Sequence, residues 1–324
     1  MTTHAIRFHT HGGSEVLQWE SIEVGDPAPD QVRLRHTAVG LNFLDVYERT
    51  GLYSVALPAI PGREGAGVIE AVGSRIRKFA VGDRVAYVAH ESGSYSQARV
   101  MPADRLVKLP DAISDQQAAA LMLKGLTAQV LLRQTYKVRA KDRVLIHAAA
   151  GGVGSLLVQW AKHLGATVIA TVGTDAKADR VRQLGADHVL LAQGDWSAQV
   201  RELTRGRGVD VVYDSVGKNT WEQTLDSLRP RGMAVFFGNS SGPVPGIEPL
   251  ALSRRGSLFM TRPTLGFYIA TPEELAWRAG DLFAWIAAGQ LDVRIGREVP
   301  LAEAESAHRA LEGRETTGKV LLIP

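Results

Sequence analysis

The chain of 324 residues contains no cysteine. This absence excludes disulfide bonds, thiolate catalysis and every metal site that needs a cysteine ligand. The sequence also lacks an apolar run close to the roughly 18 residues of a membrane-spanning helix, and no signal peptide precedes the first expected strand. We therefore expect a cytoplasmic protein.

Neither sign of charge dominates the sequence. The 37 Lys and Arg residues stand against 34 Asp and Glu residues, a formal net charge of +3, and they are interspersed along the chain. Electrostatics therefore require neither a nucleic acid nor a membrane as partner. The hydrophobic fraction of 45% suffices for the cores of two domains in a chain of this length.

The first part of the chain, up to about Leu123, is typical of a β-rich domain. Short segments alternate apolar and polar residues, and Gly-Asp and Pro-Gly pairs separate them. The pattern predicts an antiparallel, barrel-like domain with a helix at 42–49 and another that begins near Ser114, where Gln117 completes a capping pair. The clearest alternation occurs in 32–35, 67–72 and 84–88.

From about Lys124 to Arg262, strands and helices alternate strictly. Six alternating strands predict a doubly wound parallel sheet with helices on both faces. The expected strands are 144–146, 167–171, 188–191, 209–213, 233–237 and 257–260, with one helix closed by Gly165 and others at 177–184, 196–203 and 221–228.

The segment after Pro263 is assigned to the first domain. It contains an expected helix at 273–288, a strand at 293–299, a helix at 302–311 and a strand at 319–323. Because six strands already complete the parallel sheet, we expect domains at 1–123 and 124–262, with 263–324 returning to the first. The second domain is then an insertion, and a cleft is expected between the two.

A glycine-rich turn follows the strand at 144–146. Ala149, Gly151 and Gly154 fit the dinucleotide fingerprint, with alanine at the first glycine position. Gly151 would let the backbone approach a pyrophosphate, and Gly154 would let the next helix pack close to its strand. A tight turn alone can require glycine, but the strand-turn-helix-strand context favours a cofactor site whose phosphates meet the helix N-terminus. His147 is expected to be structural.

The end of the second strand of this unit indicates which dinucleotide binds. An acidic residue there accepts the ribose hydroxyls of NAD, but this chain has Thr171-Val172-Gly173-Thr174. Lys177 and Arg180 follow, where a ribose 2′-phosphate would meet positive charge. Asp175 falls at a helix start and is better explained as a dipole partner. We therefore predict NADP(H).

Six motifs together resemble one family over nearly the whole chain. The sequence is similar to the quinone oxidoreductases, the zeta-crystallin-like branch of the medium-chain dehydrogenases/reductases. The resemblance implies an α/β protein with a chaperonin-10-like catalytic domain and an inserted Rossmann domain, acting as an NADPH-dependent, homodimeric reductase. The motifs are Gly40–Tyr47, Pro61–Gly67, Leu123–Thr127, His147–Gly154, Gly238–Gly242 and Gly318–Leu321.

The resemblance also implies cofactor contacts. Lys124 and Thr127, which open the helix into the nucleotide domain, would face the nicotinamide ribose and carboxamide; a solvated lysine is the alternative for Lys124. Close relatives carry a tyrosine after the third Rossmann strand, where this chain has Leu191-Ala192-Gln193, and this departure would weaken NADPH binding or its discrimination from NADH. The remaining contacts are Gly151, Gly152, Val153, Gly154, Gly173, Thr174, Lys177, Ser215, Val216, Gly217, Phe237, Gly238, Asn239, Ser240 and Arg314.

No metal is expected. Zinc-containing relatives carry a Gly-His-Glu motif, and Arg63 stands at the position of its histidine. With no cysteine and with an arginine in place of a ligand, the catalytic zinc site cannot form. Too few residues lie between Tyr87 and Val100 for a structural zinc lobe. His9 and His11 could share a strand face, and a solvated pair is expected there.

Without a metal, the acceptor must be easy to reduce, which favours a quinone or a conjugated carbonyl. On the helix at 42–49, Asn42 could donate to the acceptor or nicotinamide and Tyr47 could orient or protonate the acceptor; Lys124 completes the predicted catalytic residues. Asn42 could equally cap the helix. Asp45, Tyr53, Tyr95 and Phe267 are the predicted substrate contacts, although Asp45 suits a structural role and the three aromatic residues suit a core.

Three functions remain open at this point. The first is an NADPH:quinone reductase, and the second is an enone or alkenal reductase on the same scaffold. The third is an NADPH-binding protein with a structural or RNA-binding role, which no stripe of aromatic and basic residues supports. We also expect a homodimer, because Leu258, Phe259 and Met260 are too apolar for a bare edge strand at 257–261.

Overall fold

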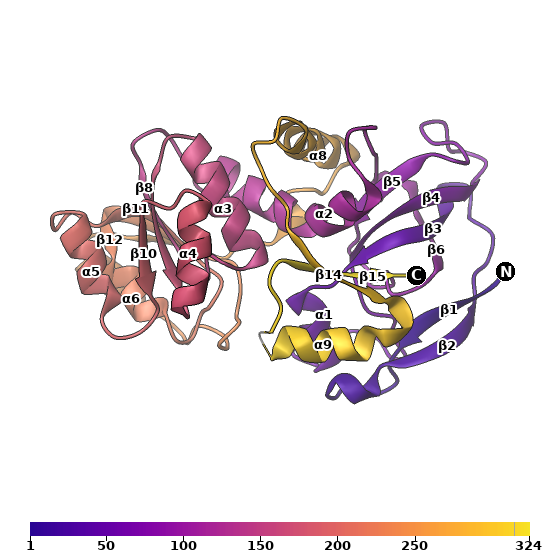
Figure 1. The fold of residues 1–324 in the computed structure, drawn as a ribbon, viewed down its shortest axis with the longest axis horizontal. Helices are drawn as coiled ribbons and strands as arrows, with labels where there is room; N and C mark the ends of the chain where they lie inside the picture. Colours follow the sequence, from indigo (N-terminus) through magenta and orange to yellow (C-terminus); the bar gives the residue numbers. More distant parts are fainter. Residues whose placement is uncertain (314) are drawn as a thin grey trace. The chain divides into compact units, whose positions relative to one another are not determined.

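The computed structural model describes residues 1–313 and 315–324, which form two compact units (Figure 1). The units divide the chain near the boundaries expected at 123/124 and 262/263. Arg314, a predicted cofactor contact, lies outside the described residues. Unit 1 comprises Met1–Leu126, Ile269–Ala288 and Asp292–Pro324, and unit 2 comprises Thr127–Tyr268 and Gly289–Leu291.

Unit 1 is built on a sheet with the strand order β14-β15-β3-β4-β5-β7, in which β6 also pairs with β3. All of its pairings are antiparallel except β14 with β15. The alternation of apolar and polar residues seen in the sequence places the apolar side chains of β3 in the core, where Val32 and Leu34 are fully buried. The strands are β3 (Gln31–Gly40), β4 (Glu64–Val72), β5 (Arg84–Val88), β6 (Ala98–Pro102), β7 (Leu106–Lys108), β14 (Ile295–Pro300) and β15 (Lys319–Ile323), with β1 (Thr2–Arg7) and β2 (Gln18–Glu23) in a separate pair.

The helices of unit 1 begin where the sequence predicts. Gln117 N donates to Ser114 Oγ over 3.1 Å and Ser114 N donates to Gln117 Oε1 over 3.0 Å, which is the expected capping pair. One prediction is wrong: Lys124 and Thr127 do not open a helix, because α2 is continuous from Asp115 to Val130 and ends in a π-helical turn, Leu131–Thr135. The other helices are α1 (Phe43–Arg49), α8 (Pro272–Ala287) and α9 (Ala304–Glu312).

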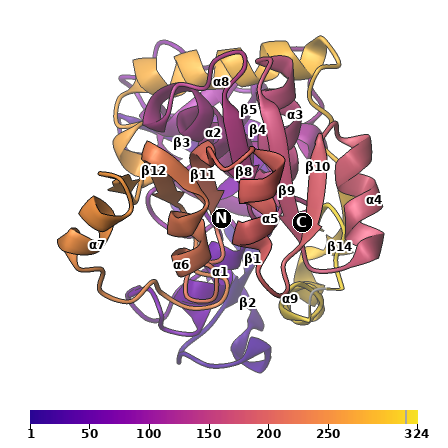
Figure 2. The ribbon, with the colours of Figure 1, turned by 90° about the vertical axis from the view of Figure 1, so that its left-hand side faces the viewer.

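Unit 2 contains a six-stranded sheet with the order β10-β9-β8-β11-β12-β13. Every pairing is parallel, so the expected doubly wound sheet is confirmed. Figure 2 shows this row of strands between its helices. The strands are β8 (Arg143–Ile146), β9 (Thr167–Val172), β10 (His188–Leu191), β11 (Val209–Asp214), β12 (Leu228–Phe236) and β13 (Phe259–Thr261); the helices are α3 (Gly152–His163), α4 (Asp175–Gln183), α5 (Trp196–Leu203), α6 (Trp221–Asp226) and α7 (Pro249–Arg254), of which α7 is not predicted.

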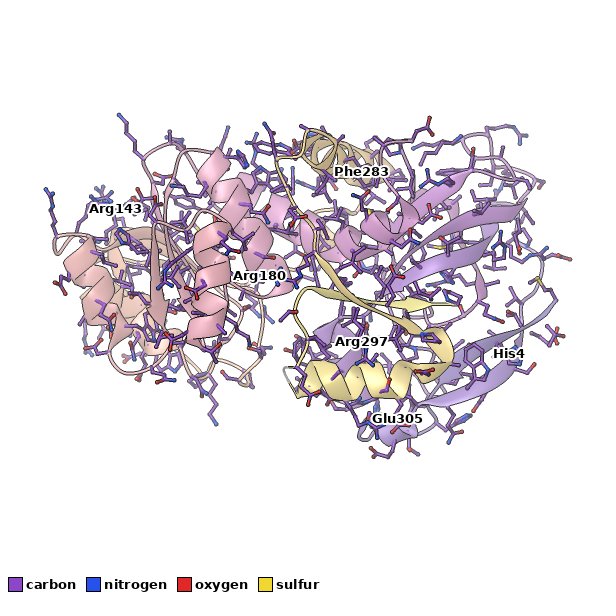
Figure 3. The ribbon with its side chains drawn as sticks, viewed as in Figure 1. His4, Arg143, Arg180, Phe283, Arg297 and Glu305 are labelled. Carbon is purple, nitrogen blue, oxygen red and sulfur yellow. The ribbon has the colours of Figure 1, made fainter. Side chains whose placement is uncertain are left out.

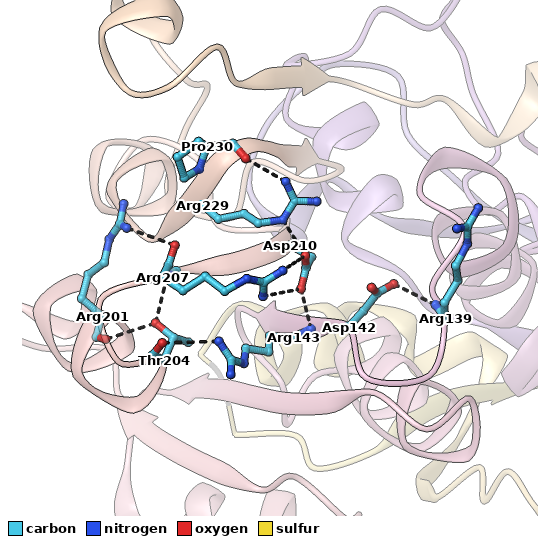
Figure 4. Close-up of polar contacts among 10 residues, drawn as sticks. Arg139, Asp142, Arg143, Arg201, Thr204, Arg207, Asp210, Arg229 and Pro230 are labelled. Carbon is cyan, nitrogen blue, oxygen red and sulfur yellow. Dashed lines mark hydrogen bonds and ion pairs between the residues drawn. The ribbon is translucent and has the colours of Figure 1, made fainter.

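A buried carboxylate holds the amino end of this sheet together (Figure 4). Asp210, near the start of β11, accepts hydrogen bonds from Arg207 Nη2 over 2.8 Å, Arg229 Nε over 2.6 Å and the backbone N of Arg143 over 2.8 Å. Burial alone would raise the pKa of Asp210, but these donors lower it below its ordinary value. These hydrogen bonds connect the amino ends of neighbouring strands, at the opposite end of the sheet from the loops described next.

No helix among the described residues is both long enough and apolar enough to span a membrane.

Candidate active site

The glycine-rich turn in unit 2 brings the first turn of α3 against its strand. A Cβ on Gly154 would lie 2.5 Å from Ala148 O and 2.8 Å from Ala149 Cα, so the close packing predicted for this glycine is confirmed. Gly151 is the N-cap of α3, and a Cβ on it would lie 3.0 Å from the same oxygen. Gly152, Val153 and Gly154 form the first turn of α3, whose N–H groups a helix leaves without an intrahelical acceptor. This turn can therefore receive a phosphate group.

Apart from Thr127, which lies on α2, the other predicted cofactor residues of unit 2 also follow the carboxyl ends of strands. Gly173 and Thr174 follow β9 and are exposed. The strand order reverses between β8 and β11, which is where doubly wound sheets bind dinucleotides. The residues after β11 are Ser215, Val216 and Gly217, and those after β12 are Phe237, Gly238, Asn239 and Ser240.

The loop after β11 is shaped by Asp214, a fully buried residue that is not predicted from the sequence. Its Oδ1 accepts from the backbone N of Val216 over 2.7 Å and of Gly217 over 3.0 Å, and its Oδ2 accepts from the hydroxyls of Thr220 and Thr224 over 2.7 and 2.8 Å. Four donors on one carboxylate fix the loop without any ligand. The sequence signal that could have indicated Asp214 was an acidic residue at the end of an apolar strand, followed by two threonines four residues apart.

His147 extends this network across the sheet. Thr224 Oγ1 donates to Asp214, so it must accept from His147 Nε2, 3.0 Å away. His147 Nδ1 is then the acceptor for the hydroxyl of Thr171, 2.7 Å away at the end of β9. Burial lowers the pKa of His147, which agrees with a neutral ring. The expected structural role of His147 is confirmed, because its side chain connects the end of β8 with β9 and α6.

The basic residues predicted for a 2′-phosphate lie on α4, directly after β9. Thr174 is the N-cap of this helix, and Asp175 lies in its first turn, where a carboxylate stabilises the positive end of the helix dipole. Lys177 and Arg180 are partly exposed; Arg180 is labelled in Figure 3. Neither residue 173 nor residue 174 is acidic. The charged side chains after β9 therefore begin with that of Asp175 and include those of Lys177 and Arg180.

Unit 1 contains a buried polar cluster centred on Glu64. Glu64 and Lys319 are 0% and 2% exposed and form an ion pair. Glu64 Oε1 also accepts from Asn42 Nδ2 over 2.7 Å, and Glu64 Oε2 accepts from the backbone N of Leu123 over 2.6 Å. Neither Glu64 nor Lys319 is predicted as a site residue; the available signal was a charged residue followed directly by small or apolar residues of a strand.

The amide of Asn42 is occupied within this cluster. Its Oδ1 accepts from Lys319 Nζ over 2.9 Å, and its Nδ2 donates to Gly40 O over 3.1 Å as well as to Glu64. Asn42 is also the N-cap of α1, and its backbone N donates to Asp45 Oδ2 over 2.9 Å. A hydrogen bond from Asn42 to an acceptor, as predicted, would therefore replace one of these bonds.

A second chain of buried side chains ends on Asp45. Arg49 Nη1 can only donate, so His308 Nδ1, 3.0 Å away, must accept, and the ring proton lies on Nε2. His308 Nε2 then donates to Tyr95 Oη over 3.0 Å, and Tyr95 donates to Asp45 Oδ2 over 2.9 Å. Every donor points toward Asp45. Because arginine cannot accept a proton here, the chain positions Asp45 and does not conduct protons away from it.

Burial sets the protonation of this chain. It raises the pKa of Asp45 to about 7, with the nearby Glu48 acting in the same direction, and lowers the pKa of His308 to about 3. Asp45 Oδ1 has no hydrogen-bond partner. Tyr95 is 0% exposed, so its predicted contact with a substrate is wrong and the alternative of a core residue holds.

Replacing His308 with glutamine is expected to flatten the acid dependence of stability. Because the folded-state pKa of His308 is about 3, the unfolded chain alone takes up its proton as the pH falls below about 6.5. Stability therefore falls by about 1.4 kcal/mol per pH unit for this group. Urea unfolding between pH 6 and 4 should show a slope smaller by that amount in His308→Gln.

His36 provides the control for this experiment. Burial lowers its pKa to about 3 as well. His36→Gln should remove a similar slope independently, since His36 contacts Ser96 and Tyr87 rather than Arg49. An unchanged slope in His308→Gln would contradict the assigned protonation state.

The predicted aromatic lining is divided between the units. Tyr47 and Tyr53 lie together in unit 1, with ring centroids 5.4 Å apart in an edge-to-face arrangement, and both are partly exposed. Phe267 lies in unit 2 and is 84% exposed. Tyr47 and Tyr53 can therefore present adjoining aromatic surface to a flat molecule.

Arg63, at the position of a zinc-binding histidine in relatives, is committed to other partners. Its guanidinium pairs with the buried Glu48 and donates to His90 O. His9 and His11 do not converge on one site: His9 Nε2 contacts Glu20 over 2.6 Å, and His11 Nδ1 contacts Arg49 O over 3.2 Å. Within the described ranges, no group of three or more His, Cys, Asp or Glu residues is placed to hold a metal ion.

Comparison with known proteins identifies both units. The family model for an alcohol dehydrogenase GroES-like domain matches residues 28–111, and the model for a zinc-binding dehydrogenase matches residues 152–284. GroES is the chaperonin-10 fold, so the expected fold class, a chaperonin-10-like domain with a Rossmann domain, is confirmed.

Full-length relatives are similar to the whole chain. The quinone oxidoreductase of Pseudomonas aeruginosa is 50% identical over 321 residues, covering 98% of this chain and 99% of the relative. A 2-haloacrylate reductase of a Burkholderia species is 47% identical over 326 residues, covering 98% and 97%. The crystal structure of Escherichia coli quinone oxidoreductase complexed with NADPH is 46% identical, with a TM-score of 0.97 over 100% of both chains. The chain therefore belongs to the quinone oxidoreductases of the medium-chain dehydrogenase/reductase family.

Proposed function

We propose that this protein reduces quinones with NADPH by hydride transfer and without a metal. The observation that carries the cofactor assignment is the glycine turn before α3, combined with the basic residues Lys177 and Arg180 beside a β9 end without an acid. The Escherichia coli relative complexed with NADPH supports the same cofactor. The names of the relatives and the adjoining rings of Tyr47 and Tyr53 support a flat quinone as acceptor.

Each group has a defined task in this proposal. Unit 2 binds the cofactor through the turn at 151–154 and the loops after β9, β11 and β12, while residues of unit 1 act on the acceptor. NADPH supplies a hydride from its nicotinamide ring. Lys124 and Tyr47 then contact the acceptor and provide hydrogen bonds to its oxygen. Besides the cofactor, this chemistry requires only one partner, the small-molecule acceptor. We propose a cytoplasmic location for the protein.

Replacing Lys177 with glutamate is expected to weaken NADPH selectively. The change removes a positive charge beside the expected 2′-phosphate and adds a negative one. The KM for NADPH should rise about 10- to 100-fold, equivalent to about 1.4–2.8 kcal/mol, while the KM for NADH stays nearly unchanged. An equal rise for both cofactors, measured by steady-state kinetics, would place Lys177 away from the 2′-phosphate. Lys162→Glu is the matched control, because it makes the same change of charge at a surface lysine that pairs with Asp187.

An enone or alkenal reductase is the second candidate, favoured by the 2-haloacrylate reductase at 47% identity. Steady-state oxidation of NADPH with 1,2-naphthoquinone, benzoquinone and a simple enone separates the candidates. The proposal expects the highest kcat/KM with a quinone. A higher value with the enone would favour the second candidate, and no turnover with any of the three would contradict both.

We further propose a homodimer through β13. This strand pairs only with β12 in the described part of the chain, and Phe259 and Met260 on it are 58% and 43% exposed. Leu258 is buried, so two of the three apolar residues would be covered by a partner strand. Light scattering at micromolar concentration should give twice the mass of one chain, and Phe259→Lys should give one. A monomeric wild type would contradict the proposal.

A further inference from the structure

The segments at the amino end of the unit 2 sheet carry an excess of positive charge. Strands β8, β11 and β12 are parallel neighbours, so the segments that precede or begin them meet at one end of the sheet. The segments 136–143, 204–210 and 228–232 contain eight Lys and Arg residues and two Asp residues, which is a net charge of +6. Because the whole chain has a net charge of +3, the other residues together carry −3. The fold therefore gathers cations that are interspersed along the sequence.

Most of these cations lack a carboxylate partner. The buried Asp210 pairs with Arg207 and Arg229, and Asp142 accepts a hydrogen bond from the backbone N of Arg139 over 2.8 Å. Both acids of these segments are therefore engaged. The exposed side chains that form no ion pair with any described residue are those of Lys137, Arg139, Lys141, Arg205 and Arg231, and we call these five residues the basic end.

Three residues of the basic end have a strained backbone. The angle φ is 73° at Lys141, 55° at Arg205 and 59° at Arg231, in the left-handed region that glycine adopts without strain. In the described part of the chain, only two other residues besides the glycines have a positive φ. The chain thus keeps long cationic side chains at turns where glycine would relieve the strain. Strained positions of this kind are typical of functional surfaces.

The basic end is separate from the cofactor loops. Those loops follow the carboxyl ends of β9, β11 and β12, at the other end of the same sheet. The six residues of β11 span about 20 Å, which exceeds the screening length of about 8 Å at physiological ionic strength. The five cations therefore have little effect on the cofactor phosphates, and their charge is available to a different anionic partner.

The surroundings of the basic end favour a lipid bilayer as that partner. Its three segments contain a single aromatic residue, the partly buried Tyr136, so they lack the rings on which the bases of single-stranded nucleic acids stack. Leu203, two residues before Arg205, is 38% exposed, and an apolar side chain among cations suits the headgroup region of a membrane. Quinones, the acceptor class proposed above, also partition into the apolar part of a bilayer.

We propose that the basic end is a docking surface for the headgroups of an anionic lipid bilayer. The choice of a bilayer among anionic partners rests on the function proposed above. The contact is peripheral and electrostatic. Each Lys or Arg near an anionic membrane surface raises the partition coefficient about fivefold, and the attraction is lost at high salt.

Sedimentation with sucrose-loaded vesicles tests this docking on the purified full-length protein. Vesicles of equal parts phosphatidylglycerol and phosphatidylcholine should sediment the protein at about 50 mM NaCl and release it at about 500 mM, because salt screens the attraction. Vesicles of phosphatidylcholine alone should not sediment it at either concentration. Failure of the anionic vesicles to sediment the protein at low salt would overturn the proposal, as would binding that does not respond to salt.

Charge reversal identifies the surface that binds. Lys141→Glu combined with Arg205→Glu leaves the pairs of Asp210 in place and should lower partition onto the anionic vesicles about 25-fold or more. The matched control is Lys78→Glu combined with Arg297→Glu, the same change of net charge at exposed residues of unit 1 that form no ion pair with a described residue. It should lower partition less than about threefold. Equal losses in the two variants would show that net charge alone controls binding and would overturn the basic end as the docking surface.

A single-stranded RNA oligonucleotide provides the comparison with another polyanion. Fluorescence anisotropy at the same low salt should show weaker binding of the wild type to this RNA than to the anionic vesicles. RNA binding that the Lys141→Glu, Arg205→Glu variant loses, in a protein that vesicles do not sediment, would assign the basic end to nucleic acid and overturn the proposal.

These results are separable from the proposed function. Docking on anionic vesicles without oxidation of NADPH by any quinone or enone would support the docking surface and contradict the reductase. Turnover of 1,2-naphthoquinone by a protein that does not sediment with anionic vesicles would support the reductase and overturn this inference. The Lys141→Glu, Arg205→Glu variant should keep the wild-type kcat with this quinone in solution, because both residues lie at the opposite end of the sheet from the cofactor loops; a lower kcat in folded protein would contradict their separate role.

Discussion

Replacing Glu64 with leucine is expected to lower the free energy of unfolding by about 3–5 kcal/mol. The carboxylate has no exposed surface and is the counter-ion of Lys319, which is 2% exposed. Its loss leaves an ammonium group buried without compensation, and it also removes the acceptor for Asn42 Nδ2 and the backbone N of Leu123. Urea unfolding monitored by circular dichroism measures the effect.

A double-mutant cycle identifies the cause of this loss. Glu64→Leu combined with Lys319→Leu removes both charges, so the double variant should regain part of the stability that the single variant loses. Recovery should be incomplete, because Asn42 and Leu123 still lack their acceptor. A double variant less stable than the sum of the two singles, or a single loss below about 1 kcal/mol, would contradict an energetically coupled buried pair.

Replacing Asp214 with alanine is the second change with a large expected effect. Asp214 accepts four hydrogen bonds, two of them from the backbone of Val216 and Gly217 in the loop after β11. Removing the carboxylate leaves two N–H groups and two hydroxyls without their acceptor, at a cost of about 3–5 kcal/mol. If the loop binds the cofactor, the dissociation constant for NADPH should also rise about tenfold or more, an effect that fluorescence titration measures.

Asp210 provides a matched control on the same strand. It is also buried and multiply bonded (Figure 4), but it lies near the start of β11, whereas Asp214 is its last residue. Asp210→Ala should destabilise the protein by a similar amount and leave the affinity for NADPH unchanged at a temperature where both variants are folded. Equal effects of the two variants on NADPH affinity would show that stability alone, and not the loop after β11, controls binding.

Most elements of unit 2 could be predicted, because each of these has a local signal. Apolar strands, amphipathic helices and terminal glycines predict the succession of β8 to β12 along the chain, and the strict alternation of strands and helices implies parallel pairing. The short helix α7 lacks such a signal, since Pro249–Arg254 has no buried residue. The continuity of α2 across Lys124 was also missed, because Gly125 interrupts the apolar pattern of the helix. A Cβ at this position would lie 2.5 Å from Leu282, so glycine allows Leu282 to pack closely against α2.

Some site residues were predicted from a local motif. Others were missed, including Glu64 and Lys319 within two of the quoted motifs, because only the fold brings them together. Gly151 and Gly154 belong to a local pattern, and the structure confirms the close packing predicted for Gly154. Glu64 and Lys319 are 255 residues apart in sequence, and His308 is 213 residues from Tyr95. Such pairs depend on the register of strands and helices far apart in the chain. Tyr95 was wrongly predicted as a substrate contact because an aromatic residue in a loop does not by itself indicate whether its side chain is buried.

The rate of NADPH oxidation with 1,2-naphthoquinone, measured on enzyme dialysed against a chelator and checked for zinc in the same sample, tests the central claim most directly. The account predicts full quinone-dependent turnover with less than about 0.1 zinc per chain, because the chain offers no cysteine ligand and the guanidinium of Arg63, which pairs with Glu48, cannot ligate zinc. Loss of turnover on chelation that added zinc restores would contradict it, as would one tightly held zinc per active chain.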